Sequence, residues 1–186
     1  KYDKNKNVVL LYDLPNQSPP CAPCLVGAGA DGVVPFNQPF QIIDSNNIIT
    51  NSDLLKFHNK DWRGFYNFKS ICCVFPETTK QVQLLLKYCN QHNIKVVPQG
   101  GNTSLTGASV PSKDNHEIII NLKKMNQILS IDKINYSITL ESGCILNDIK
   151  TYVNKKNFYF PLNIGSGGSC QIGGNVATNA GGINVL

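Results

Sequence analysis

The sequence lacks the features of a membrane protein and of a nucleic-acid-binding protein. No stretch of about 18 uninterrupted apolar residues occurs, which excludes a transmembrane helix. Lys and Arg number 17 against 12 Asp and Glu, so the net charge is only +5. The lysines are scattered rather than gathered with aromatic residues in one patch, and this pattern disfavours nucleic-acid binding. The length and composition predict one ordinary globular domain.

The common nucleotide-binding motifs are also missing. No glycine is followed by Lys and then Ser or Thr, so a Walker-type phosphate loop is excluded. A Rossmann turn needs a third glycine three residues after Gly-x-Gly, but Gly165-Ser-Gly167 is followed at that position by Cys170. We therefore do not expect a nicotinamide dinucleotide to bind in the usual way.

No acid–base or metal-binding set can be assembled from the sequence. The three histidines are His58, His92 and His116, and none is near another plausible ligand. We interpret each of them as structural. Paired carboxylates and a Ser-His-Asp set are also absent. The sequence thus predicts no metal site and no catalytic residue within this chain.

Two kinds of cysteine occur among the seven. Cys21 and Cys24 form a C-x-x-C, but no strand precedes it, no helix follows it, and no second ligand pair is evident. We interpret this motif as a loop coincidence. The other five lie in or beside apolar stretches, as buried thiols of a reducing compartment do; they are Cys72, Cys73, Cys89, Cys144 and Cys170.

The chain begins with Lys1 rather than Met and ends at Leu186, four residues after a glycine pair. We expect it to be a fragment of a longer protein. Any targeting peptide would then be absent from the sequence.

The pattern of elements predicts an α+β fold. Residues 1–40 are rich in Pro and Gly and indicate an irregular leader with one strand over 8–12, whereas 41–186 form the domain. Strands and helices then mix without strict alternation. The expected elements are a helix over 51–58 capped by Ser52; a strand over 69–75; a helix opened by the capping box Thr78–Gln81, with Val82, Leu85, Leu86 and Cys89 on one face; strands over 94–97 and 117–122; a hairpin of 128–132 and 137–142; and a helix with Ile145, Ile149 and Val153 on one face.

A short glycine loop directly follows the strand over 94–97. It reads Pro98, Gln99, Gly100, Gly101, Asn102, Thr103, Ser104. We expect Gly100 and Gly101 to take positive φ, and Asn102 is the next best tolerated residue there. Such a turn can direct several backbone N–H groups at one anion, most often a phosphate, while Thr103 and Ser104 add hydroxyl donors.

A second glycine-rich tract runs from Gly165 to Gly182 and is expected to be a loop. Two such loops in one small chain favour a long, bent, phosphate-bearing ligand. A dinucleotide fits this description.

Both loops resemble those of a known flavoprotein family. The segment Val97-Pro-Gln-Gly-Gly-Asn-Thr-Ser-Leu-Thr-Gly-Ala-Ser-Val-Pro111 resembles the pyrophosphate loop of the vanillyl-alcohol-oxidase-type (PCMH-type) FAD-binding domain. Pro161-Leu-Asn-Ile-Gly-Ser-Gly-Gly-Ser-Cys-Gln-Ile-Gly-Gly-Asn-Val-Ala-Thr-Asn-Ala-Gly-Gly182 is the most specific block. Asn59-Lys-Asp-Trp62 and Leu122-Lys-Lys-Met-Asn126 add support. The resemblance covers residues 41–186 and is closest to the D-2-hydroxyglutarate and D-lactate dehydrogenases.

The resemblance implies that FAD lies between two α+β subdomains and that the domain is incomplete at its C-terminus. Relatives with a covalent flavin carry a histidine at the position of Asn102, so non-covalent FAD is expected here. The residues that the resemblance assigns to the cofactor are Pro98, Gln99, Gly100, Gly101, Asn102, Thr103, Ser104, Pro161, Gly165, Ser166, Gly168, Gly173, Gly174, Asn175, Ala177, Thr178, Asn179, Ala180 and Gly181.

The resemblance further implies a dehydrogenase that oxidises a D-2-hydroxy acid, best D-2-hydroxyglutarate, at C2 by hydride transfer to the flavin. A downstream electron acceptor other than NAD would reoxidise it. The substrate-binding cap would lie beyond Leu186. The alternatives are a D-lactate or glycolate dehydrogenase and a non-catalytic FAD-binding fragment. By analogy the protein is mitochondrial, and otherwise cytoplasmic.

Overall fold

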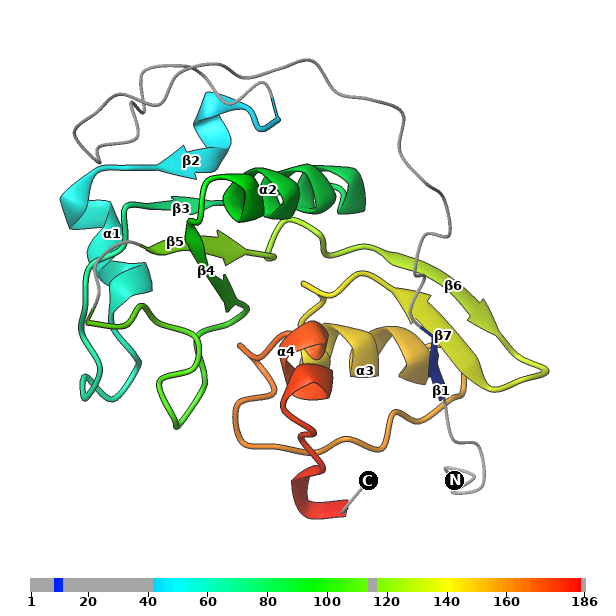
Figure 1. Cartoon of the computed structure of the whole chain (residues 1–186). Coiled ribbons are helices and arrows are strands. Elements are labelled where there is room, and N and C mark those ends of the chain that lie inside the picture. Colours follow the sequence, from blue (N-terminus) through cyan, green and yellow to red (C-terminus); the bar gives the residue numbers. More distant parts are fainter. Residues whose placement is uncertain (1–8, 12–41, 114–116, 185–186) are drawn as a thin grey trace, which may run out of the picture.

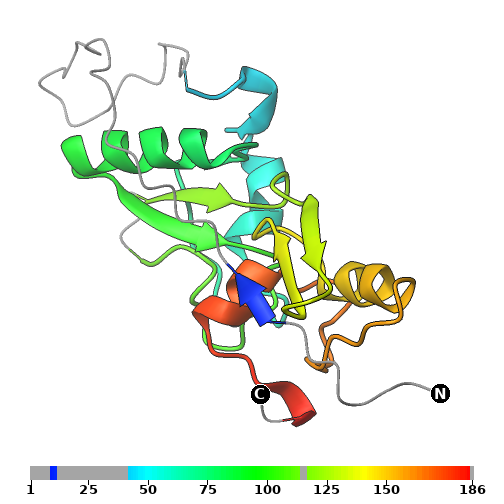
Figure 2. The same ribbon diagram turned by 90° about the vertical axis from the view of Figure 1, so that its right-hand side faces the viewer.

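The computed structural model describes residues 9–11, 42–113 and 117–184. The motif Cys21–Cys24 and His116 lie outside these residues. Two sheets lie side by side and are joined by the segment 122–127 (Figures 1 and 2). Each sheet has its own apolar core, so the described chain forms two subdomains.

The first subdomain is built on a four-stranded sheet in the order β2-β3-β5-β4. Its strands are β2 (Ile48–Ile49), β3 (Cys72–Val74), β4 (Lys95–Gln99) and β5 (Glu117–Asn121). Both β3 and β4 run parallel to β5, and β2 is antiparallel to β3. All five residues of β5 are buried, which is typical of a central parallel strand covered on both faces.

Two helices cover the two faces of this sheet. Leu85 and Cys89 of α2 (Thr79–Gln91) pack with Ile118 and Ile120 on one face. Leu55 of α1 (Ser52–Asn59) packs on the other face. A 3-10 turn, η1 (Ser45–Asn47), leads into β2. The two faces of this sheet are therefore both covered by helices.

The second subdomain contains the predicted hairpin. Its strands are β6 (Ile128–Asp132) and β7 (Ser137–Leu140), and β1 (Val9–Leu11) adds to β7 in parallel. The helices are α3 (Leu146–Asn154) and α4 (Ile172–Ala177), followed by the turn η2 (Gly182–Asn184). The predicted apolar positions Ile149 and Val153 are fully buried in this core. The mixture of helices and sheets confirms the α+β class.

Several local predictions can be compared with the structure. The capping box is confirmed, since the Thr78 hydroxyl accepts from the N–H of Gln81 and the Gln81 side chain accepts in return. The N-cap of α1 is Asn51, so the assignment of Ser52 was wrong. Asn and Ser are equally good N-cap residues, so the sequence did not distinguish Asn51 from Ser52 as the cap.

The predictions for Leu86 and for the second glycine tract were also wrong in part. Leu86 is 47% exposed, whereas Leu85 and Cys89 of the same helix are buried against the sheet. The tract contains the short helix α4 rather than loop alone. Its two glycines disfavour a helix, but its backbone is fixed from outside, as described below.

The five described cysteines are all buried and unpaired, as predicted. Burial raises the pKa of Cys72 and of Cys73 to about 12, so these thiols are unreactive. No described helix is long and apolar enough to cross a membrane. Within the described residues, no group of three or more acidic, His or Cys side chains is placed to hold a metal ion.

Candidate functional site

The first glycine loop leaves the sheet at the carboxyl edge of the parallel strands. It begins where β4 ends, beside the end of β5. Ligands of open parallel sheets bind outside this edge. The loop from Gly100 to Ser109 therefore stands where such a fold places a ligand, and only Gln99 at its start is fully buried.

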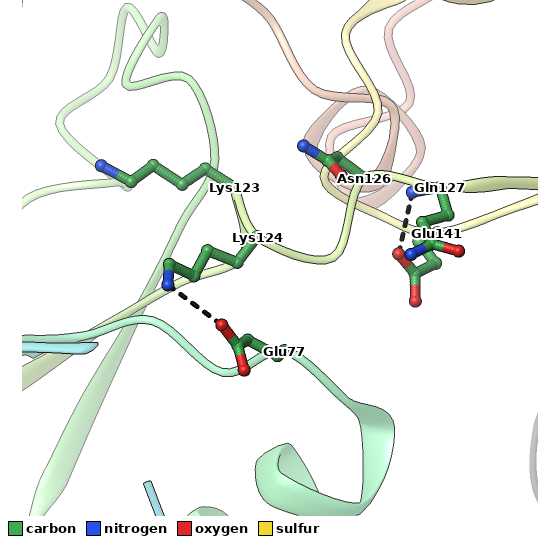
Figure 3. A pocket seen from close by; sticks show the side chains of 6 residues that line it. All are labelled: Glu77, Lys123, Lys124, Asn126, Gln127 and Glu141. Carbon is green, nitrogen blue, oxygen red and sulfur yellow. Dashed lines mark hydrogen bonds and ion pairs between the residues drawn. The ribbon is translucent and has the colours of Figure 1, made fainter. Parts of the chain in front are cut away.

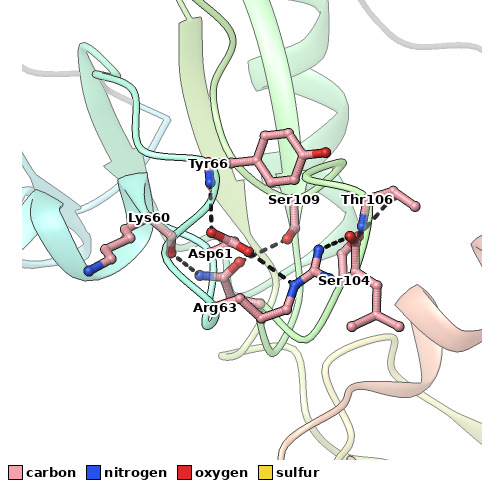
Figure 4. Close-up of polar contacts among 9 residues, drawn as sticks. Lys60, Asp61, Arg63, Tyr66, Ser104, Thr106 and Ser109 are labelled. Carbon is pink, nitrogen blue, oxygen red and sulfur yellow. Dashed lines mark hydrogen bonds and ion pairs between the residues drawn. The ribbon is translucent and has the colours of Figure 1, made fainter.

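The loop presents a run of free N–H groups. In the described part of the chain, none of the five N–H groups from Gly100 to Ser104 donates to a protein acceptor. Among the described residues, the hydroxyl of Ser104 hydrogen-bonds only to Thr106 (Figure 4). No acidic or basic side chain occurs in residues 98–112 or 161–184. An anion here would be bound by neutral donors, as in other backbone anion sites.

Asn102, rather than the glycines before it, adopts positive φ, at 53°. The expectation that Gly100 and Gly101 take positive φ was wrong. The side chain of Asn102 is also engaged at both ends. Its Nδ2 donates to the Lys60 carbonyl at 2.8 Å, and its Oδ1 accepts from the Ser109 hydroxyl at 2.8 Å. Asn102 thereby fixes the shape of the loop.

A turn over residues 60–66 supports the loop from one side (Figure 4). The Arg63 guanidinium donates to the Leu105 carbonyl and lies 3.7 Å from the buried Asp61 carboxylate. Burial alone would raise the pKa of Asp61, but hydrogen bonds from the Tyr66 and Arg63 N–H groups and the Arg63 charge lower it overall. Asp61 therefore stays ionised and holds the turn against the loop.

The two glycine regions touch each other through their backbones. A Cβ on Gly101 would lie 1.9 Å from the carbonyl oxygen of Ser169, which leaves no room for any side chain. A Cβ on Gly100 would meet the side chain of Gln171 at 3.3 Å. Gly101 is therefore a contact between the two loops, and the structure thereby unites segments that are about 70 residues apart in the sequence.

At two other glycine positions, no contact within the protein excludes a side chain. A Cβ on Gly165 or on Gly174 would have no protein atom within 4 Å. By contrast, a Cβ on Gly173 would lie 2.6 Å from Ser142, so Gly173 is required by packing. Open space beside Gly165 and Gly174 suits a ligand that lies against the backbone.

The start of α4 is held by the protein itself. The N–H groups of Ile172 and Gly173 donate to the carbonyls of Cys144 and Ser142 at 2.9 and 2.8 Å. These bonds explain why a glycine-containing segment is helical. They also leave those two N–H groups unavailable to a ligand.

The other predicted residues of the second tract differ in exposure. Asn175 is buried and its amide contacts the Cys170 sulfur at 3.4 Å, so its side chain points into the protein. The Thr178 hydroxyl donates back to the Gly174 carbonyl at 2.8 Å. The rest lie at least partly at the surface; they are Pro161, Ser166, Gly168, Ala177, Asn179, Ala180 and Gly181.

A hollow of about 600 Å³ lies elsewhere, and none of the predicted residues lines it. Figure 3 shows its charged side chains. Lys124 pairs with Glu77 at 3.0 Å, and Glu141 accepts from the N–H of Gln127 at 2.8 Å. Lys123 lies 4.3 Å from the centre of the Phe75 ring. The hollow is open and polar, so it suits water and ions better than a large aromatic ligand.

Sequence reasoning missed the residues that support the loops from behind. These are Asp61, Arg63, Tyr66, Ser109, Asn121, Ser169 and Gln171. Asn59-Lys-Asp-Trp62 was noted only as part of the resemblance, and Trp62 itself is 64% exposed. A buried Asp is rarely predictable without the structure, because Asp is almost never fully buried unless it is paired, and sequence alone does not show the pairing.

Comparison with known proteins agrees with this geometry. Residues 71–186 match the FAD binding domain family, which is more than half of the chain. The chain belongs to this FAD-binding family. The match includes both glycine loops, so the predicted PCMH-type FAD-binding fold and the FAD cofactor are confirmed.

Curated relatives extend the match upstream of residue 71. The mitochondrial D-2-hydroxyglutarate dehydrogenase of Danio rerio is 44% identical over 147 residues, and that of Arabidopsis thaliana is 42% identical over 146 residues. A Schizosaccharomyces pombe protein with the provisional name of a mitochondrial D-lactate dehydrogenase is 47% identical over 145 residues. The alignments cover 78–79% of this chain but 26–27% of these relatives. The chain thus spans about a quarter of their length.

Solved structures show the same fold at low identity. Alkyldihydroxyacetonephosphate synthase superimposes with a TM-score of 0.65 at 18% identity, over 72% of this chain and 26% of that one. A Phl p 4 variant described as a glucose dehydrogenase gives a TM-score of 0.59 at 17% identity, over 72% and 29% of the two chains.

Proposed function

We propose that this chain forms the FAD-binding part of a flavin-dependent dehydrogenase for D-2-hydroxy acids, with D-2-hydroxyglutarate as the first candidate substrate. The observation that carries the proposal is the run of five free N–H groups at Gly100–Ser104, held against the second glycine tract by the Gly101–Ser169 contact. The identity of 42–44% to D-2-hydroxyglutarate dehydrogenases supports the substrate class.

The two loops would divide the cofactor between them. The N–H groups of Gly100–Ser104 and the hydroxyls of Thr103 and Ser104 would bind the pyrophosphate. The open backbone at Gly165 and Gly174 would lie along the rest of FAD, where any Cβ would displace it. Neutral donors suffice, because several N–H dipoles directed at one anion replace its water without a formal charge.

FAD would be held without a covalent bond. The side chain at the position of the flavin-linked histidine is Asn102, and both ends of its amide are occupied by Lys60 and Ser109. A carboxamide is also a poor nucleophile. Binding would therefore depend on the N–H groups, the hydroxyls and close packing alone.

When bound, FAD would supply the hydride acceptor for oxidation of the substrate at C2. The described residues would bind and orient it. We assign no catalytic residue to this chain, because neither loop contains an ionisable side chain that could move a proton. Reduced cofactor would pass its electrons to a downstream acceptor. The mitochondrial names of the relatives support a mitochondrial location, by analogy.

The second candidate is a D-lactate or glycolate dehydrogenase of the same family, favoured by the 47% identity to the S. pombe protein. A third candidate is a domain that binds FAD without turnover. Binding and turnover assays separate these candidates.

The first experiment is titration of flavin-free protein with FAD, FMN and NAD, followed by flavin fluorescence and gel filtration. FAD should bind in a 1:1 ratio and more tightly than FMN, because FMN lacks the AMP half and the second phosphate. Dye reduction with D-2-hydroxyglutarate, D-lactate and glycolate then tests the substrate class. The 186-residue chain alone should bind but not turn over. Tight binding of NAD but not FAD would overturn the proposal.

A further inference from the structure

The side chain of Gln99 is buried and uses all of its hydrogen-bonding capacity. It is 2% exposed. Its Nε2 donates to the carbonyls of His58 and Ser109 at 2.9 and 2.7 Å. Its Oε1 accepts from Asn121 Nδ2 at 3.0 Å and lies 2.7 Å from His58 Nδ1. A primary amide has two donors and two good acceptor sites, so none is left for a ligand.

The direction of this network is fixed by the backbone. Carbonyl oxygens can only accept, so the nitrogen of the Gln99 amide must face the His58 and Ser109 carbonyls. Its oxygen must then face the His58 ring, which therefore carries a proton on Nδ1. Burial lowers the pKa of His58, and the Lys123 charge lowers it further, although the bond to Gln99 raises it. At a pH above this lowered pKa, the His58 ring is neutral and donates its Nδ1 proton to Gln99 Oε1.

The partners of Gln99 hold both ends of the glycine loop. Gln99 ends β4, where the loop starts, and Ser109 lies near the point where it ends. Asn121 at the end of β5 also donates to the Gly100 carbonyl at 3.2 Å. His58 lies in the last turn of α1. One amide therefore ties the loop to α1, β4 and β5 together.

We propose that Gln99 is a positioning residue that sets the path of residues 100–109 and offers no side-chain atom to the cofactor. His58 and Asn121 act through it. This inference rests on the proposed FAD function, because the loop that Gln99 orients is the one assigned to the pyrophosphate. Without this network, the loop would lose the backbone conformation that presents its five N–H groups.

The test compares Gln99→Met with Gln99→Glu in the purified protein. Met keeps the length but makes none of the four bonds. Glu keeps the shape, but its second oxygen would face two carbonyls and would need a proton. The readouts are the Kd for FAD and, in flavin-free protein, hydrogen exchange in the loop, each at pH 5.5 and pH 8. Loop exchange is followed at Thr106 and Val110, whose N–H groups are hydrogen-bonded to Ser104 Oγ and to the Gly107 carbonyl.

Gln99→Met should weaken FAD binding by about tenfold or more at both pH values and speed exchange in the loop, as loss of buried hydrogen bonds does. Gln99→Glu should be equally weak at pH 8 and should recover in part at pH 5.5. The groups that can share its proton are His58 and, more distantly, Lys123. Ile119→Val, which removes one buried methylene from β5, is the control and should change neither readout in the loop.

A second pair of variants uses the half-buried partner, where misfolding is less of a risk. His58→Asn can still donate from the position of Nδ1 and should keep loop exchange as slow as in the parent protein. His58→Leu cannot donate and should speed loop exchange. Unchanged loop exchange in Gln99→Met and His58→Leu would overturn the inference. If the parent protein binds no FAD, the proposed function fails, but the exchange readout in flavin-free protein still decides the role of Gln99.

Discussion

The backbone of Gly101 packs directly against the carbonyl of Ser169, so closely that a Cβ on Gly101 would lie 1.9 Å from that oxygen. This contact joins the loop after β4 to the tract before α4. Each segment by itself is an ordinary glycine loop. Together they form one surface with contributions from both subdomains.

Gly101→Ala should separate the two loops. The new methyl group meets backbone atoms, which cannot rotate away, and overpacking of this kind costs about 1–3 kcal/mol. Urea denaturation of flavin-free protein should show this loss, and FAD affinity should fall with it. Gly165→Ala is the matched control for the stability of flavin-free protein, since its methyl group enters open space there. Equal stability of Gly101→Ala and the parent protein would contradict the contact.

Gly174→Ala should raise the stability of the flavin-free protein and weaken FAD binding. Gly174 lies within α4 with no atom near its Cβ position, so alanine should stabilise the flavin-free protein by about 0.5–1 kcal/mol. The same methyl group would occupy space assigned to FAD. Thermal unfolding should rise while FAD affinity falls. A variant that is both more stable and equally tight for FAD would place the cofactor away from α4.

The stability of the protein should decrease as the pH falls below about 6.5, the ordinary pKa of histidine. The folded state lowers the pKa of His58, chiefly by burial, so between the two pKa values the unfolded chain binds more protons. The contribution of His58 is therefore complete above pH 6.5 and lost as the pH falls toward the folded pKa. Urea midpoints at pH 7.5 and 5.5 measure the loss, and His58→Asn should reduce it. An identical pH dependence in parent and variant would show that His58 is not its source.

Acid denaturation of FAD-loaded protein should release all of the flavin into solution. Asn102 provides no atom for a flavin linkage, and its amide is held by Lys60 and Ser109. The absorbance of the supernatant after precipitation measures the released fraction. Yellow colour that stays with the washed precipitate would mean a covalent bond and would contradict the non-covalent assignment.

Much of the fold could be predicted from local sequence. The capping box at Thr78 and Gln81 satisfies backbone groups within four residues, so it can be predicted from the sequence. The structure confirms it. The hairpin β6–β7 and the buried face of α3 follow from apolar periodicity in the same way. These elements depend mainly on neighbours in the chain.

The features that sequence reasoning missed depend on distant neighbours. The helix α4 forms because Cys144 and Ser142 accept its first N–H groups, and nothing in Ile172-Gly-Gly-Asn175 itself favours a helix. In the same way, the contact of Gly101 with Ser169 was not predicted, and the expected positive φ of Gly101 was wrong. Gln99 was expected among the ligands, and its side chain is buried among protein partners.

The most direct test of the account is hydrogen exchange of the protein with and without FAD. The N–H groups of Gly100–Ser104 have no protein acceptor in the described chain, so they should exchange fast in flavin-free protein. FAD should slow exchange in this loop and in residues 165–181 together, because the account has one cofactor held by both. FMN, with a single phosphate, should protect 100–104 less. Tight FAD binding that leaves both segments as fast as before would contradict the proposed site.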